Sequence, residues 1–196
     1  YCFLAVLVAL TVNPLAAYSL SRYLLPSQYK VLLFFITTGA FPAMVTMIPN
    51  YLLLKDLGLL NTFAALILPG VANGYSIFLL KGFFDTLPRE LFEAAELDGA
   101  SEWYKFWGIS LKLSTPILAV IALGAFTAAY GNFMFAFVLC QDSAMWTLMV
   151  WLYQLQYYAA PGVQFASLLL AAIPTLAVFI LAQRIIIRGI VVPQEK

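Results

Sequence analysis

Residues 113–140, LSTPILAVIALGAFTAAYGNFMFAFVLC, decide the fold class of this chain, because they run for 28 residues without a charged side chain. A helix needs about 20 consecutive, mostly apolar residues to cross a lipid bilayer, so this run predicts a transmembrane helix. Other runs that meet the requirement are residues 1–20, 31–54, 59–83 and 165–187. None of them alternates polar and apolar residues as a membrane β-strand does. We therefore expect an all-α integral membrane protein with about five transmembrane helices.

The composition of the whole chain agrees with a membrane location. Of its 196 residues, 64% are hydrophobic and 10% are charged, whereas soluble domains carry roughly 25% charged residues. The mean hydropathy is +0.94. The lipid bilayer is the expected surrounding, and the net charge of +1 gives no basis for a nucleic-acid partner.

Residue types that usually build catalytic or metal sites are scarce. The chain contains no histidine, which is the commonest metal ligand and general base. Its two cysteines, Cys2 and Cys140, lie in apolar runs without a paired spacing, so we expect small core side chains. We expect no catalytic residue and no metal site on this chain.

The basic residues predict the orientation of the chain. If the five runs cross the membrane alternately, every basic residue except Lys55 falls on one side. The residues on that side are Arg22, Lys30, Lys81, Arg89, Lys105, Lys112, Arg184, Arg188 and Lys196. Cytoplasmic loops are enriched in Lys and Arg. We therefore expect the N-terminus of this chain outside and its C-terminus in the cytoplasm.

A charged segment, residues 85–112, precedes the apolar run quoted first and lies on the predicted cytoplasmic side. Asp85 or Thr86 is placed to cap a short helix, and Pro88 suits its first turn. Gly99 suits a left-handed helix end. The segment therefore predicts a helix that stops at a glycine.

This predicted helix has an apolar face, because Leu87, Leu91, Ala94 and Ala95 recur at helical spacing. A second helix is expected to start at Ser101 and to continue into the next apolar run. Two helices that meet at a glycine form a compact protrusion outside the membrane.

Small and acidic side chains gather at the junction of the two helices. The small residues are Ala94, Ala95, Gly99 and Ala100. The acidic residues around them are Glu93, Glu96 and Asp98. A helix that lies on a membrane surface usually carries Lys and Arg on its polar face. The acidic character therefore favours a protein partner over the alternative, an amphipathic loop resting on lipid.

Polar side chains inside the apolar runs are candidates for lining a solute pathway. They are Asn73, Tyr75, Tyr130 and Asn132. An amide in lipid needs a hydrogen-bond partner, so we expect Asn73 and Asn132 to face protein or a cavity. The alternative is that these side chains join neighbouring helices.

The charged segment matches a family motif. The string Glu93-Ala94-Ala95-x-x-Asp98-Gly99-Ala100-Ser101, followed by Ile109-x-Leu111, resembles the EAA loop of binding-protein-dependent ABC importer permeases. Leu79-Leu80-Lys81-Gly82-Phe83-Phe84 with Leu87-Pro88, and Gln183-Arg184 with Arg188-Gly189, resemble the carbohydrate-type, maltose-permease-like subfamily. The resemblance covers essentially the whole chain.

The chain departs from the family pattern in two places. Lys112 stands where the family usually has proline. The family commonly has a further N-terminal span, and this chain does not begin with Met. We therefore expect a partial chain that lacks that span.

The resemblance implies a type I ABC importer permease, in which residues 1–196 form one transmembrane domain and residues 85–112 form a cytoplasmic coupling loop. That loop would dock into a separate ATPase subunit through Glu93, Ala94, Ala95, Asp98, Gly99 and Ala100. The implied partners are two ATPase subunits, a second permease subunit and an extracytoplasmic solute-binding protein, in a prokaryotic inner membrane. ATP and magnesium are expected on the ATPase, since this chain has no GxxxxGK[ST] loop.

The substrate implied by the subfamily is a sugar or an oligosaccharide. One alternative is a permease of the same kind for a peptide, an amino acid or an ion. Another is a transporter or channel that needs no ATPase, but such proteins place ionisable residues at mid-membrane, and these runs lack them. A membrane enzyme would need a nucleophile–base pair or metal ligands, and no pattern in the sequence indicates either.

Overall fold

The computed structural model describes residues 1–23 and 27–190, and within these ranges the chain is helical with no strand. The helices are α1 (Cys2–Arg22), α2 (Gln28–Thr38), α3 (Ala43–Asp56), α4 (Phe63–Ile67), η1 (Leu68–Gly70), α5 (Gly74–Asp85), α6 (Arg89–Leu97), α7 (Glu102–Tyr104), η2 (Lys105–Ser110), α8 (Leu111–Leu113), α9 (Thr115–Tyr130), α10 (Phe133–Leu139), η3 (Ser143–Met145), α11 (Leu148–Leu155) and α12 (Pro161–Ile190). Of the basic residues used for orientation, Lys196 lies outside the described residues, and the side chain of Arg188 is not described.

Long apolar helices confirm the fold class predicted from the sequence. In the described ranges, α1 and the Pro161–Ile187 part of α12 are each long and apolar enough to cross a bilayer. Three further candidate spans consist of helix pairs that bend at a short break. The total is five if each bent pair counts as one span.

The predicted continuous helix over residues 31–54 is wrong, because α2 and α3 meet at 96°. Gly39 follows the last residue of α2, and Pro42 precedes the first residue of α3. Proline has no N–H to donate and disfavours helical backbone in the residue before it, so the helix stops and restarts in a new direction.

The runs over residues 59–83 and 113–140 are also interrupted. In the first, α4 with η1 bends by 50° into α5, and Asn73 caps α5 by accepting a hydrogen bond from the Ser76 N–H at 2.9 Å. In the second, Gly131 and Asn132 separate α9 from α10. At the first of these breaks, side-chain capping by Asn73 compensates for an interruption that hydropathy alone does not show.

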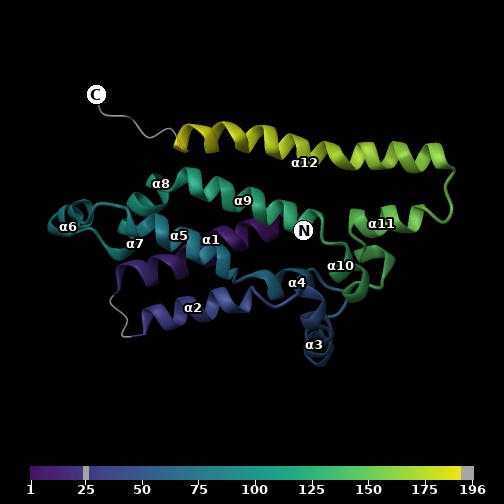
Figure 1. Cartoon of the computed structure of the whole chain (residues 1–196), viewed down its shortest axis with the longest axis horizontal. Coiled ribbons are helices and arrows are strands. Elements are labelled where there is room, and N and C mark those ends of the chain that lie inside the picture. Colours follow the sequence, from purple (N-terminus) through teal and green to yellow (C-terminus); the bar gives the residue numbers. More distant parts are fainter. Residues whose placement is uncertain (24–26, 191–196) are drawn as a thin grey trace.

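Helices α1, α5 and α9 form the centre of the molecule. Helix α1 packs against α5 and α9, α12 packs on α9, and α2 packs on α5. Figure 1 shows α12 along one edge and α2 along the opposite edge, with α1, α5 and α9 between them. Helices α6 and α7 lie at one end of this bundle, and α10 and α11 lie toward the other.

A close backbone contact brings α2 against the start of α5. A Cβ atom on Gly74 would overlap the backbone carbonyl of Phe35. Only glycine leaves room for that approach, since any other residue carries the Cβ atom. Gly74 is buried, directly after the Asn73 cap.

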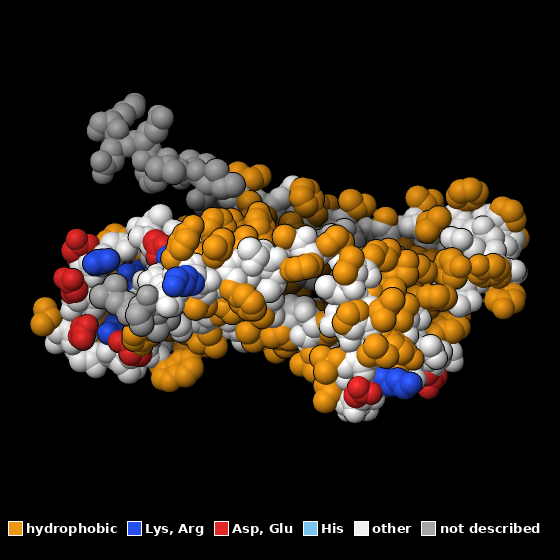
Figure 2. All heavy atoms as spheres, turned by 60° about the horizontal axis from the view of Figure 1, so that its bottom comes forward, with side chains coloured by type: hydrophobic (Ala, Val, Ile, Leu, Met, Phe, Trp, Pro, Cys, Tyr) orange, Lys and Arg blue, Asp and Glu red, His pale blue; other side chains and the backbone are white. Residues whose placement is uncertain are grey.

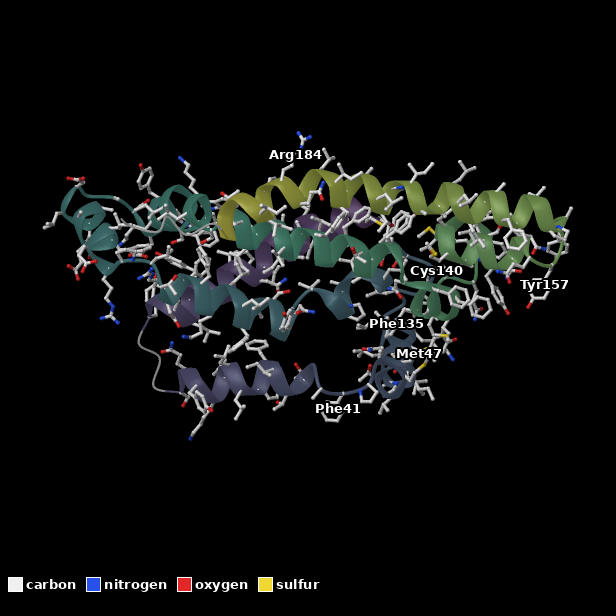
Figure 3. The ribbon with its side chains drawn as sticks, turned by 45° about the horizontal axis from the view of Figure 1, so that its top comes forward. Phe41, Met47, Phe135, Cys140, Tyr157 and Arg184 are labelled. Atoms are coloured by element: carbon white, nitrogen blue, oxygen red, sulfur yellow. The ribbon has the colours of Figure 1, made fainter. Side chains whose placement is uncertain are left out.

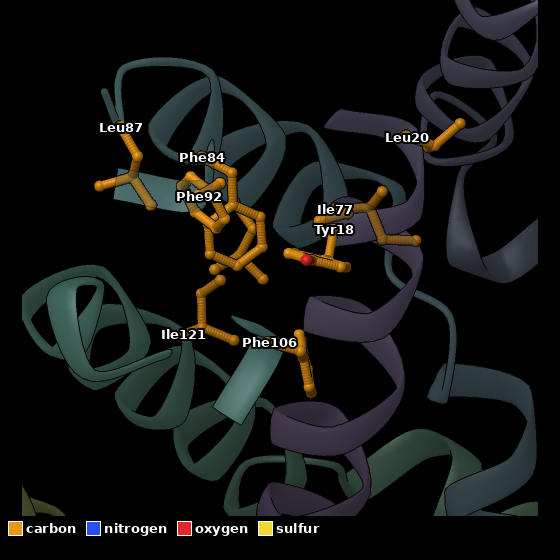
Figure 4. Packing of buried hydrophobic residues seen from close by; sticks show 10 residues of the cluster. Tyr18, Leu20, Ile77, Phe84, Leu87, Phe92, Phe106 and Ile121 are labelled. Atoms are coloured by element: carbon orange, nitrogen blue, oxygen red, sulfur yellow. The ribbon is translucent and has the colours of Figure 1, made fainter. Parts of the chain in front are cut away.

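The larger hydrophobic core lies where the bundle meets α6 and α7. It combines residues of α1, α5, α6, η2 and α9, among them Tyr18, Phe84, Phe92, Phe106 and Ile121. Figure 4 shows the rings of Phe84, Phe92 and Tyr18 converging in this core. The protruding loop is therefore packed onto the bundle rather than tethered to it by flexible chain.

Charged and apolar side chains occupy different parts of the surface. In Figure 2 the red and blue side chains gather at the end that carries α6, with a smaller charged group elsewhere, while the face between them is mostly apolar. Exposed leucine, isoleucine and phenylalanine side chains also cover α12. Such a surface suits lipid or another membrane subunit.

Candidate functional site

The helix predicted at the start of residues 85–112 is present as α6, but its beginning differs from the prediction. Pro88 is the N-cap residue, and no side chain caps the helix. Asp85 instead ends α5, where its carboxylate pairs with Lys81 at 2.6 Å. Thr86 donates its hydroxyl to the Phe83 carbonyl at 2.7 Å. The i,i+4 ion pair favours continuing α5 through Asp85, so capping by Asp85 or Thr86 is wrong.

The end of α6 confirms the predicted glycine stop. Gly99 has φ +77°, in the left-handed region. The Gly99 N–H donates to the Glu96 carbonyl at 3.0 Å, and the Ala100 N–H donates to the Ala95 carbonyl at 2.9 Å. This pair of bonds is the Schellman motif, which satisfies the last carbonyls of a helix.

The second helix also starts where the sequence predicts. The Ser101 hydroxyl accepts a hydrogen bond from the Tyr104 N–H at 3.3 Å and caps α7. The chain then makes a π-helical turn, η2, and bends by 82° into α9. The helix–glycine–helix protrusion expected from the sequence is therefore present and leads directly into a bundle helix.

The side chains on the predicted apolar face of α6 differ in burial, and the bundle buries one that is not among them. Phe92 and Leu87 are buried, whereas Leu91 is 44% exposed. The reason is the end of α1: the guanidinium carbon of Arg22 lies 3.6 Å from the centre of the Phe92 ring. This contact turns Phe92 toward the bundle, and no local pattern in the sequence predicts it.

An ion-pair network joins the two helices of the protrusion. The Lys105 amino group lies 2.5 Å from Glu102 and 3.5 Å from Glu96. The hydrogen bond from Lys105 holds the pKa of the Glu102 carboxyl below its ordinary value. Glu102 also accepts a hydrogen bond from the Tyr18 hydroxyl at 3.2 Å. The network fixes the angle between α6 and α7 and ties both to α1.

The candidate docking residues lie together on the outside of this protrusion. Those that are exposed are Glu93, Ala94, Asp98 and Gly99, and those that are half-buried are Ala95 and Ala100. Leu97 lies among them with 90% of its surface exposed. Leu97 was not singled out from the sequence, because a leucine in an amphipathic helix is ordinarily assigned to the buried face.

A cavity of about 420 Å³ lies between α1, α5, α9 and the α4–η1 segment. Its lining includes three of the four candidate pathway residues: Asn73, Tyr75 and Asn132. The fourth, Tyr130, is not among the lining residues, and its hydroxyl donates to the Ala171 carbonyl of α12 at 2.7 Å. Tyr130 thus joins two helices, which was the alternative to lining a solute pathway.

Asn13 is a cavity residue that sequence reasoning missed. It is fully buried on α1, and its Oδ1 accepts a hydrogen bond from the Asn73 N–H at 2.9 Å. Its Nδ2 donates to the Ala9 carbonyl at 2.9 Å. The available signal was an amide inside an apolar run, the same signal that pointed to Asn73 and Asn132.

The cavity offers amide and hydroxyl groups without charge. Asn73, Asn132, Tyr75 and Ser76 line it together with small apolar residues, and none of its lining residues is charged. No cluster of acidic or cysteine residues that could hold a metal ion occurs in the described ranges. The lining suits hydrogen bonding to a neutral polar molecule.

Comparison with known proteins agrees with this arrangement. The family described as binding-protein-dependent transport system inner membrane component matches residues 13–192. Protein LplC of Bacillus subtilis is 37% identical over 166 residues, which cover 76% of this chain and 56% of that protein. The maltodextrin transport system permease protein MdxG of Bacillus subtilis is 34% identical over 187 residues, covering 92% of this chain and 66% of that protein.

A probable ABC transporter permease protein of Pyrococcus horikoshii is 32% identical over 189 residues, covering 94% of this chain and 68% of that protein. The chain thus spans between 56% and 68% of the length of these relatives. A chain in the crystal structure of a bacterial ABC transporter that imports the acidic polysaccharide alginate shares the fold, with a TM-score of 0.83 at 24% identity, over 94% of this chain and 71% of that chain. The chain belongs to the family of binding-protein-dependent transport system inner membrane components.

Proposed function

We propose that this chain is the permease subunit of an ATP-driven importer of neutral sugars or oligosaccharides. The observation that carries the proposal is the rigid packing of the helix–glycine–helix protrusion onto helices that also line the cavity. A loop built in this way transmits movement from a bound partner to the cavity, which is what rigid-body coupling requires.

The outer surface of the protrusion is the docking surface for a separate ATPase subunit. It consists of Glu93, Ala94, Ala95, Asp98, Gly99 and Ala100, and we add Leu97 because its side chain is 90% exposed among them. Small side chains allow a partner surface to approach closely, and the carboxylates supply charge-assisted hydrogen bonds. ATP and magnesium bind to the ATPase, so hydrolysis takes place on the partner and this chain is not an enzyme.

The proposed assembly lies in a prokaryotic inner membrane, with the N-terminus of this chain outside and its C-terminus in the cytoplasm. The charge distribution supports this orientation, because the protrusion carries Arg89 and Lys105. The assembly contains two ATPase subunits, a second permease subunit that forms the other half of the pathway, and an extracytoplasmic solute-binding protein.

The cavity supports a neutral saccharide as the solute. Its volume of about 420 Å³ falls in the range of small-molecule sites, roughly 300–1,000 Å³. Binding of a phosphorylated or acidic sugar is usually assisted by Arg or Lys, and the lining contains neither. Relatives named for maltodextrin and diacetylchitobiose support the same class, whereas others are named for polygalacturonan and for sn-glycerol-3-phosphate.

Reconstitution in lipid vesicles tests the proposal. The complete transporter is assembled from this permease, its second permease and its ATPase, and uptake is measured with the solute-binding protein and ATP. We expect uptake of a neutral oligosaccharide that stops when the ATPase is omitted. Uptake that persists without the ATPase would identify an independent transporter or channel. Transport of only galacturonate oligomers or glycerol phosphate would refute the neutral class while leaving ATP coupling intact.

A further inference from the structure

The C-terminal end of helix α1 is bonded to the last residues of α5, which lead into the protrusion. The Ser21 hydroxyl donates to the Asp85 carboxylate at 2.7 Å, and an Arg22 N–H donates to the Phe84 carbonyl at 3.0 Å. The Arg22 guanidinium also lies over the ring of Phe92, which belongs to α6. Arg22 thus touches α5 and α6 at the same time.

The same helix is bonded to the cavity further along its length. Asn13 joins α1 to the α4–α5 break through the Asn73 N–H. Ala5, Val8 and Ala9 of α1 line the cavity as well. Helix α1, which contains Pro14, therefore carries contacts both to the protrusion and to residues around the cavity.

The two contacts of Arg22, with the Phe92 ring and with the Phe84 carbonyl, require an arginine side chain. A cation over an aromatic face is attracted by the ring, and the attraction is stronger where water is excluded. Arg22 adds a hydrogen bond in the plane of its guanidinium, which a lysine cannot reproduce with the same geometry. Phe92 is buried, so the contact is shielded from water on the ring side.

We propose that α1 is the rigid link between the protrusion and the cavity, and that Arg22 is a positioning residue that holds α6 in its docking orientation through Phe92. The inference rests on the proposed function, because the link matters only if the protrusion receives movement from an ATPase. It goes further by assigning the transmission to one helix and to a named side-chain contact.

Substitutions at the contact test the role of Arg22 in the complete reconstituted transporter. The quantity measured is solute moved per ATP hydrolysed, alongside the ATPase rate. Arg22→Leu and Phe92→Leu are each expected to lower this ratio by about fivefold or more, the lower end of typical coupling between sites. The double variant is expected to be no worse than either single one, because both remove the same contact. Arg22→Lys keeps the cation and is expected to recover part of the ratio.

Arg184→Leu is the matched control. Arg184 is an exposed arginine of α12 that projects away from the other helices (Figure 3), so its loss is expected to leave the ratio unchanged. A wild-type ratio in Arg22→Leu, or additive losses in the double variant, would overturn the positioning role. A merely structural role would reduce assembly and ATPase rate together, without a selective change in the ratio.

Cross-linking tests the rigid link even if the Arg22 variants fail to assemble. Ser21→Cys and Asp85→Cys are introduced after Cys2 and Cys140 are replaced by alanine, and a short thiol cross-linker joins them. We expect transport to continue after cross-linking, because the two segments move together. Transport that stops on cross-linking and returns when the link is cleaved would show that α1 moves against the end of α5, from which the protrusion extends, and would overturn the rigid link. Failure of the proposed function is distinguishable, since the parent protein would then show no ATP-driven uptake.

Discussion

The backbone N–H of Asn73 donates to the side-chain oxygen of Asn13 at 2.9 Å, and this bond joins two helices at a break in one of them. Asn73 in turn caps α5 with its own side chain. The break would otherwise leave unpaired N–H groups in an apolar region, which is costly. Two asparagines therefore allow a helix to bend beside the cavity.

Replacement of Asn13 by leucine is expected to destabilise the bundle by about 0.5–1.5 kcal/mol, the net contribution of a typical intramolecular hydrogen bond. The donor left unpaired is the Asn73 N–H. Thermal unfolding of the detergent-solubilised transporter measures the effect. Thr11→Val is the control, because the Thr11 hydroxyl bonds only to carbonyls of its own helix. Equal unfolding temperatures for the Asn13 variant and the parent would contradict the bridging role.

Replacement of Gly99 by valine is expected to distort the end of α6 and weaken ATPase docking. A non-glycine residue in left-handed backbone costs roughly 1–2 kcal/mol, and Gly99 has φ +77°. The measurement is the affinity of the purified ATPase for the permease pair in detergent. Gly82→Ala serves for comparison, since a Cβ on this helical glycine meets nothing within 4 Å. We expect the ATPase to bind the Gly99→Val variant more weakly than the Gly82→Ala variant. Similar affinities would show that docking does not need the left-handed turn at Gly99.

Leu97→Ala is expected to weaken docking without affecting the fold of the permease. The side chain is 90% exposed, so it contributes little to the core. Full burial of a leucine against a partner is worth about 1.5–3 kcal/mol, and losing most of that lowers affinity by about tenfold or more. Leu57→Ala removes a similar exposed side chain away from the protrusion, at 61% exposure. An ATPase that binds both variants as tightly as the parent would exclude Leu97 from the docking surface.

The Glu102–Lys105 pair predicts a dependence of stability on pH. The hydrogen bond from Lys105 lowers the pKa of Glu102 from its ordinary 4.5. The stabilisation is therefore fully present above the ordinary pKa and is lost as the pH falls through the lowered one. Unfolding temperatures are compared between about pH 7 and pH 3, a range that brackets the glutamate pKa. The parent is expected to lose more stability on acidification than Glu102→Gln; parallel curves would show that the pair does not contribute.

The parts of the fold that sequence predicts are those set by local chemistry. Gly99 and Ser101 mark the ends of two helices because backbone handedness and capping act within a few residues. The direction in which α6 faces depends on Arg22, which lies 70 positions from Phe92. No period in the sequence carries that information, so the burial of Phe92, which is not one of the residues on the predicted apolar face, could not be predicted locally.

The same distinction explains the outcome for the apolar runs. Hydropathy located them because burial in lipid is averaged over about 20 residues. The packing of one interrupted run on another depends on contacts such as Gly74 with the Phe35 carbonyl, which bring distant segments together. Polarity alone was enough to propose Asn73, Tyr75 and Asn132 as cavity residues. The hydrogen bond of Tyr130 to α12 joins distant segments, so the sequence does not predict it.

The right-angled join of α2 and α3 bears on how the chain is made. Their 11 and 14 residues are each short of the roughly 20 needed to cross a bilayer alone. Helix α2 has no buried residue of its own and rests on α5 through the Gly74 contact. During synthesis, α2 leaves the ribosome before the backbone it rests against exists. The packing of α2 is therefore expected to be completed only after α5 has emerged, later than the order of the segments in the chain would suggest.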